Sequence, residues 1–159
     1  MTTTRAEVIA KAREYLGSPY RHQGRVKHKA IDCLGLIACV AEELGISDAS
    51  GQPILRSQHL DYPPTGDSLR LLAEFCVPRL VERKDIQLGS IVALKLAKEP
   101  IHLAICASLG TSLSMIHVCS ARPRIASRQL PNAGSVAEHV MDHTWRQRVC
   151  RIFDVPGIR

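Results

Sequence analysis

The sequence predicts an α+β fold, because helical patterns come first and strand patterns follow. Up to about residue 77, apolar residues recur at helical spacing. From about residue 90, short segments rich in β-branched residues alternate with turn-like pieces, which is typical of consecutive antiparallel strands. This separation indicates α+β rather than βαβ units. The length of 159 residues allows one sizeable core, so we expect a single domain over residues 1–159.

The first segment predicts an amphipathic helix with a defined start. Thr4 and Glu7 stand at the spacing of a capping box, in which each side chain accepts a hydrogen bond from the other residue's backbone amide. Apolar residues then recur on one face of residues 5–16, and Gly17 is a typical stop. The following SPYRHQGRVKHKA, residues 18–30, predicts an irregular basic loop.

The stretch AIDCLGLIACVAEELGI predicts the central helix of the fold. Asp32 is a favourable N-cap, and Gly45 ends the apolar run. Apolar residues between these two positions cover most of the helix circumference, so we expect the helix to be buried on nearly all sides.

The rest of the chain predicts a loop, two helices and five strands. Prolines and glycines mark residues 47–67 as a loop, after which Asp67 would cap an amphipathic helix that closes at Pro78. Strands are expected at residues 90–96, 101–107, 114–120, 135–141 and 150–156, with a short helix at 142–149.

Composition excludes several classes of function. Hydrophobic residues make up 45% and charged residues 23%, as in ordinary globular proteins, and no apolar run approaches the length of a membrane span. The N-terminus lacks the apolar core of a signal peptide, so we expect synthesis in the cytoplasm without one. The net charge of +6 suits an anionic polymer, but aromatic residues at 4% supply little stacking surface, which argues against nucleic acid.

One of the six cysteines stands out. Most lie inside apolar segments, where a free thiol behaves as a small hydrophobe, and none has the CxxC spacing of a zinc or redox site. Cys33, however, follows the cap Asp32 at the N-terminus of the central helix. Orphan amides and the positive end of the helix dipole favour a thiolate there, so we expect a lowered pKa and a nucleophile.

Two histidines on neighbouring predicted strands are candidates for the base. His102 opens the strand IHLAICA, and His117 lies within the next strand, SMIHVCS. If the strands pair, both rings can face the same side of the sheet. A thiol with an imidazole base, oriented by a further polar group, is the arrangement for cysteine nucleophilic catalysis.

These segments together resemble the NlpC-type cell-wall cysteine peptidases of the papain-like superfamily. YLGSPYRHQG and IDCLGLIACVAEELG resemble the family's Gly-x-x-Tyr loop and its Asp-Cys-x-Gly helix start, while QLGSIVALKL, IHLAIC and SMIHVCSA resemble its core strands. The ordered match runs from about Tyr15 to about Ala121. PYRHQG, DCLGL, the segment at Tyr62 and VAEHV with WRQR look most like the branch found in phage tails and gene-transfer agents.

The resemblance implies roles for individual residues in a papain-like fold whose central helix packs on an antiparallel sheet. Cys33 would be the nucleophile, His102 the general base and His117 the residue that holds its ring, forming a Cys-His-His triad. Tyr20 would lie near the thiol and bind substrate or oxyanion. Asp32 would cap the helix and bind the substrate amine, and His22 would line the cleft.

The substrate that the resemblance implies is the peptidoglycan stem peptide, cut by an amidase at γ-D-glutamyl linkages to a diamino acid. The branch implies phage-like tail proteins as partners, with action at the cell wall, and neither metal nor organic cofactor. The chain departs from the family at residues 21–24, where only Gly24 remains of paired glycines, and at Leu34, where Ser is usual. Both changes concern substrate preference more than chemistry.

Three alternatives stay open on the sequence alone. A catalytically silent tail-assembly protein would keep the same fold, and acyl transfer would use the same Cys-His pair. His139 and His143 are four residues apart and would share a helix face, as zinc ligands do, although the HExxH order is absent. The sequence also leaves open the bond cleaved, the oligomeric state, the tail partner and whether residues 47–83 gate the site.

Overall fold

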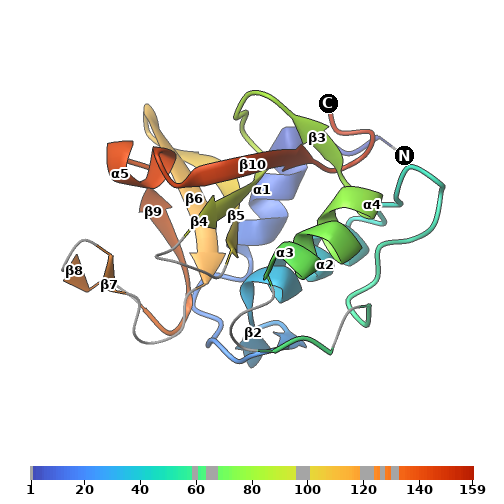
Figure 1. Ribbon diagram of the computed structural model, residues 1–159, viewed down its shortest axis with the longest axis horizontal. Helices are drawn as coiled ribbons and strands as arrows, with labels where there is room; N and C mark the ends of the chain where they lie inside the picture. Colours follow the sequence, from blue (N-terminus) through green and yellow to red (C-terminus); the bar gives the residue numbers. More distant parts are fainter. Residues whose placement is uncertain are drawn as a thin grey trace.

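The computed structural model describes residues 2–58, 61–63, 68–95, 101–118, 124–125, 128–129 and 133–159. Two helices, α1 (Arg5–Arg13) and α2 (Cys33–Glu43), precede most of the strands, and an antiparallel sheet follows (Figure 1). The predicted α+β class is therefore confirmed. No helix among the described residues has the length and apolar character needed to cross a membrane.

The main sheet has six strands in the order β3-β10-β4-β5-β6-β9, and every neighbouring pair is antiparallel. Its strands are β3 (Val81–Arg83), β4 (Ile91–Lys95), β5 (Ile101–Leu109), β6 (Ser112–Val118), β9 (Val136–Val140) and β10 (Val149–Asp154). The register of β5 on β6 runs from Ile105 opposite Ile116 to Leu109 opposite Ser112. Both predicted histidines lie just outside this paired stretch.

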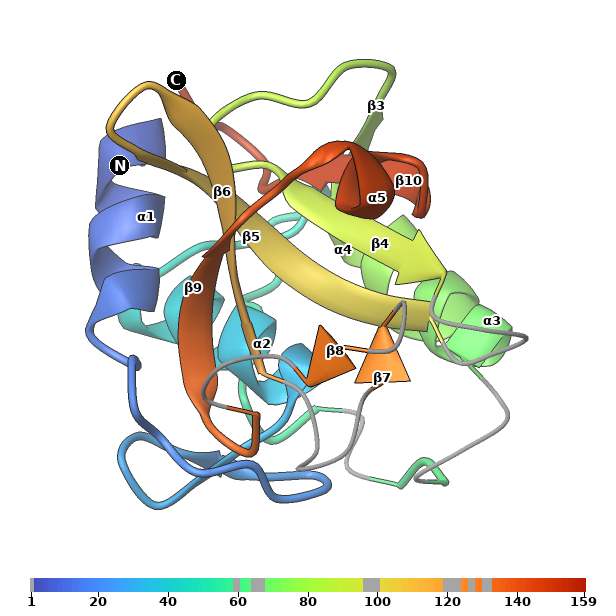
Figure 2. The same ribbon diagram turned by 90° about the vertical axis from the view of Figure 1, so that its left-hand side faces the viewer.

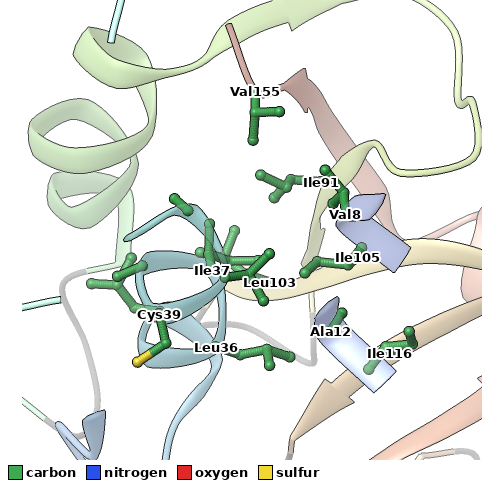
Figure 3. Packing of buried hydrophobic residues seen from close by; sticks show 14 of the residues in the cluster. Val8, Ala12, Leu36, Ile37, Cys39, Ile91, Leu103, Ile105, Ile116 and Val155 are labelled. Atoms are coloured by element: carbon green, nitrogen blue, oxygen red, sulfur yellow. The ribbon is translucent and has the colours of Figure 1, made fainter. Parts of the chain in front are cut away.

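The larger apolar core lies between the sheet and the two N-terminal helices. Val8 of α1 and Ile37 of α2 pack there against Leu103 and Ile105 of β5 (Figure 3). The opposite sheet face carries a smaller cluster that includes Met115 and Trp145 of α5 (His143–Arg146). Figure 2 shows α1 and α5 on different sides of the sheet. Alternate residues of β4, β5 and β6 therefore enter different clusters, as period-2 geometry requires.

Local sequence signals account for the two N-terminal helix starts. The Thr4 side chain accepts from the Glu7 amide, and the Glu7 side chain accepts from the Thr4 amide, so the predicted capping box is confirmed. Asp32 caps α2 as predicted, accepting from the Gly35 amide at 2.7 Å. Eight of the eleven residues of α2, from Leu34 to Ala41, are buried, as expected for a central helix.

The third helical segment differs from the prediction. The helix does not close at Pro78 but runs through α3 (Ser68–Leu71), a π-helical turn (Leu72–Cys76) and α4 (Val77–Arg79). Pro78 has no amide proton for the carbonyl of Glu74, which instead accepts from the Arg79 guanidinium at 2.7 Å. The side chain of the following residue thus replaces the missing backbone donor. The predicted cap Asp67 lies outside the described residues.

Several short elements were not predicted. The expected irregular loop contains a hairpin, β1 (Arg25–Val26) with β2 (Ala30–Ile31), and the chain forms a second one, β7 (Arg124–Ile125) with β8 (Arg128–Gln129). Strands of only two residues are too short to show a detectable period in the sequence. The edge strand β3 was missed for the same reason, since its three residues are all exposed.

Candidate active site

The thiol of Cys33 lies at the first residue of α2, beside the start of β5. Its side chain is partly buried against the larger core cluster. The backbone amides of Leu103 and Leu34 lie close enough to the sulfur to favour the ionised form, which lowers the thiol pKa in part. Because Leu103 directly follows His102, the sulfur lies at the end of β5 where the predicted base is attached. The thiol approaches this end of the strand from the side of α2.

The hairpin β1–β2 packs tightly against the N-terminus of α2. A Cβ added to Gly35 would lie 2.1 Å from the carbonyl oxygen of Gly24, and one added to Gly24 would lie 2.4 Å from the carbonyl carbon of Ala30. Neither distance is possible for a side chain without a shift of the backbone. These two glycines therefore let the loop approach the helix closely enough to fix the position of Cys33.

Asp32 is the polar centre of this junction. One carboxylate oxygen accepts from the Gly35 amide at 2.7 Å and from the Arg25 guanidinium at 2.8 Å. The other accepts from the Gln23 amide at 2.7 Å and from the Tyr62 hydroxyl. Its residue is only 3% exposed. Asp32 thus joins the helix to the loop and to the segment at Tyr62, with both of its oxygens engaged; its expected role as ligand of a substrate amine stays a prediction.

His102 and His117 form a direct hydrogen-bonded pair. His102 Nε2 lies 2.8 Å from His117 Nδ1, and the two rings meet edge to face at 74°. The expectation that both rings share a sheet face is therefore confirmed. That face is opposite the one packed on α2, since Leu103 and Ile116 enter the larger cluster while Ala104 and Met115 enter the smaller one.

A third histidine, His139, extends the pair, and the sequence prediction missed this role. His117 Nε2 lies 2.7 Å from His139 Nδ1. The indole of Trp145 packs edge to face on the His117 ring, with centroids 5.5 Å apart. The predicted strand over residues 135–141 included His139 but not its register. In the structure Met115 faces His139 across the β6–β9 pair, which places His139 diagonally beside His117.

The expected lowering of the Cys33 pKa is wrong. Burial raises the pKa of this thiol to about 11, the nearby Asp32 carboxylate raises it further, and the amides of Leu103 and Leu34 offset only part of the effect. Burial lowers the pKa of His102 to about 4. The local rule at helix N-termini is overridden because loss of water disfavours the thiolate more than the amides favour it. The resting groups are therefore a neutral thiol and a neutral imidazole.

Because both imidazoles are buried, we expect the free energy of unfolding to decrease as the pH is lowered. Burial, together with the rings of His102 and His139, lowers the pKa of His117 well below its usual value. Between pH 6.5 and about 4 the unfolded chain binds protons at His102 and His117 that the folded chain does not, so the free energy of unfolding decreases by up to about 1.4 kcal/mol per pH unit for each ring. Urea denaturation at pH 7, 6 and 5 measures this slope.

Two variants, His102→Asn and His143→Asn, test the assignment of this pH dependence of the unfolding free energy to the buried rings. The first removes one buried imidazole and should reduce the slope by about half, whereas the second removes an exposed ring and should leave it unchanged. Carboxylates with lowered pKa values, such as that of Asp154, titrate below this window. A wild-type stability that does not change from pH 7 to pH 5 would contradict the neutral burial of both rings.

The remaining expected site residues lie on two sides of the loop before α2. Tyr20 forms a parallel bridge with Ile31, and its amide donates to the Gly134 carbonyl at 2.7 Å. Because Ile31 is two residues before Cys33, this bridge places Tyr20 beside the start of α2. His22 instead binds the Tyr62 carbonyl at 2.7 Å. It lines an open groove of about 460 Å³ with Arg21, Gln23, Gly24, Arg25, Val26, Ala30, Arg56 and Ser57.

The helical spacing required by the zinc alternative does not form. His139 lies on strand β9, and His143 begins α5. His139 Nδ1 is directed at His117, and the His143 ring pairs with Gln147. Within the described part of the chain, no cluster of three or more His, Cys, Asp or Glu side chains is arranged to hold a metal ion.

Comparison with known proteins gives matches of fold at low sequence identity. No protein-family model and no curated protein matches the chain. Among solved structures, the NlpC/p60 domain of the peptidoglycan hydrolase SagA is similar over 96% of this chain and 100% of its own, with a TM-score of 0.52 and 15% identity. A lipoprotein-like protein of the NLP/P60 family from Staphylococcus aureus is similar over 97% of this chain and 43% of its own, with a TM-score of 0.56 and 16% identity. The chain thus has the fold of NlpC/P60 domains.

Proposed function

We propose that this protein is a cysteine hydrolase that cleaves amide bonds in peptidoglycan stem peptides. The observation that carries the proposal is the position of Cys33 at the start of α2, where the backbone amide of Leu103, the residue after His102, acts on the thiol, while the His102 ring is paired with His117. The likeness to the NlpC/P60 domain of a peptidoglycan hydrolase supports the choice of substrate. The geometry supports acyl chemistry independently of that likeness.

The proposed reaction begins with proton transfer from the Cys33 thiol to His102 Nδ1. That nitrogen is the one turned away from the pair, because Nε2 of the same ring is engaged with His117. As this proton leaves, the sulfur attacks the amide carbonyl in the same step, and amides at the α2 N-terminus stabilise the oxyanion. His102 delivers the proton to the leaving amine, which departs and leaves a thioester on Cys33. Water, deprotonated by His102, hydrolyses the thioester.

Neutral resting groups make His102 a true general base in this scheme. With a thiol pKa near 11 and an imidazole pKa near 4, no ion pair forms before substrate binds. Proton transfer then accompanies attack, and the charge that develops on His102 is stabilised by the His117 lone pair.

Finer features of the proposal come from the sequence resemblance. We propose γ-D-glutamyl linkages to a diamino acid as the bond cleaved, and a phage-like tail as the assembly that carries the protein to the cell wall. Tyr20 is proposed as a ligand of substrate or oxyanion, which its bridge to Ile31 beside the helix start supports. His22 and its groove are proposed as an outer substrate contact, since the exposed Arg21 of that groove suits an anionic wall polymer.

Digestion of purified muropeptides tests this function. Wild-type protein should release new amino groups, and mass spectrometry of the products should identify one amide bond type. Activity should persist in a strong chelator, because the scheme uses no metal. Added amine acceptors distinguish hydrolysis from acyl transfer by the mass of the product. Intact muropeptides of every stem-peptide type after prolonged incubation would contradict the proposal and favour a catalytically silent tail protein.

A further inference from the structure

His139 occupies the end of a continuous row of three imidazoles that begins at His102. The nitrogen-to-nitrogen distance is 2.8 Å from His102 Nε2 to His117 Nδ1 and 2.7 Å from His117 Nε2 to His139 Nδ1. Successive ring centroids are 5.0 Å apart in both cases. His117 therefore uses both of its nitrogens within the row, so its protonation is linked to both neighbours.

Chemistry at Cys33 fixes which nitrogen carries each proton. His102 can accept a proton at Nδ1 only if its single proton is on Nε2, from where it donates to His117 Nδ1. His117 must then be protonated at Nε2, and it donates to His139 Nδ1. The reverse assignment would place a proton on His102 Nδ1, the nitrogen proposed to accept the thiol proton, and would prevent it from acting as a base. One direction of donation along the row is thus compatible with catalysis.

We propose that His139 is a positioning residue, which holds His117 in the Nε2–H form and thereby keeps His102 ready to accept the thiol proton. This inference rests on the proposed function in one respect, the pairing of Cys33 with His102. Without an acceptor at position 139, the buried His117 ring is free to place its proton on Nδ1, opposite His102 Nε2. The Nδ1 lone pair of His139 also strengthens His117 as the acceptor when His102 becomes charged.

The burial of the row favours this role over a purely structural one. His117 is only 1% exposed and His102 is 7% exposed, so water is a poor substitute for a lost ring partner. Trp145 covers the His117 ring from the side and restricts its rotation. His139 is partly exposed at the outer end, on edge strand β9, where a substitution disturbs few core contacts.

The test uses His139→Leu and His139→Asn. Asparagine places an amide oxygen where His139 has Nδ1, while leucine removes the acceptor. We expect His139→Leu to lower kcat for muropeptides about 10-fold with little change in KM, and to slow carbamidomethylation of Cys33 by a similar factor, whereas His139→Asn retains most of both rates. His143→Leu, an exposed ring on the adjoining helix, is the matched control and should behave as wild type.

A double variant separates action through His117 from any other effect. His117→Asn keeps an acceptor toward His102 but has no group directed at His139. Adding His139→Leu to His117→Asn should therefore cost nothing further, because the row is already cut. Independent losses that multiply in the double variant, or equal losses in His139→Leu and His139→Asn, would overturn the proposal.

Nitrogen-15 chemical shifts of the histidine rings in the wild-type protein give a measurement that needs no variant to fold. We expect His117 to carry its proton on Nε2, and a proton on Nδ1 would overturn the inference. Because the shifts and the carbamidomethylation rates require no substrate, they separate the two claims. Inactivity toward muropeptides with the expected shifts and rates would refute the proposed substrate while supporting the role of His139.

Discussion

Replacing Cys33 with alanine is expected to abolish amide hydrolysis, with a loss of more than about 10³-fold in kcat. Covalent catalysis passes through a thioester on this sulfur, and no other described thiol lies at a helix N-terminus beside β5. Cys39, Cys76 and Cys106 are buried in the core, and Cys150 is exposed on β10. The measurement is the rate of amino-group release from muropeptides under identical protein concentrations.

Two matched variants make this result specific. Cys33→Ser keeps the size of the side chain but replaces the sulfur by a weaker nucleophile, so it should be nearly as inactive as Cys33→Ala. Cys150→Ala removes an exposed thiol on β10, two strands from β5, whose sulfur donates to the Ala93 carbonyl at 3.2 Å, and should retain full activity. Equal turnover by Cys33→Ala and wild type would end the proposed mechanism.

Replacing Asp32 with alanine is expected to lower the free energy of unfolding by about 3–5 kcal/mol. The change removes the carboxylate at the centre of the junction and leaves the guanidinium of Arg25, which is 8% exposed, without its 2.8 Å ion-pair partner. It also removes the N-cap acceptor of α2 and the hydrogen bonds from Gln23 and Tyr62. This loss is a large part of the stability of an ordinary domain.

Urea denaturation followed by circular dichroism measures this effect. Asp61→Ala provides the control, because that carboxylate is exposed on the neighbouring segment and its loss should change stability by less than about 0.5 kcal/mol. Asp32→Asn should be intermediate, since the amide keeps one acceptor but loses the charge. A loss below about 1 kcal/mol for Asp32→Ala would show that the junction does not depend on its carboxylate.

Features that rest on neighbouring residues in the sequence were predictable. Thr4 and Glu7 form their capping box, Asp32 caps the central helix, and the two strands bearing His102 and His117 pair as their alternation indicated. The contact between the two rings followed from the same alternation once the strands were adjacent. Each of these features depends on a spacing of a few residues or on a simple period.

Features that depend on distant parts of the chain were not predictable. The local environment of Cys33 favours a thiolate, yet packing against β5 removes water and raises the pKa instead. The contacts of Asp32 include Tyr62, which is thirty residues away. The link from His117 to His139 required the register of β9, which the sequence pattern does not contain. Burial and register are properties of the assembled sheet.

The rate at which Cys33 is carbamidomethylated at pH 7, relative to Cys150 in the same molecule, tests the central claim most directly. A partly buried thiol with a pKa near 11 should react more slowly than the exposed Cys150 unless an imidazole assists it. We predict that Cys33 reacts faster in the wild type, and that His102→Ala reverses the order. Slower reaction of Cys33 than of Cys150, unchanged by His102→Ala, would contradict a working thiol–imidazole pair.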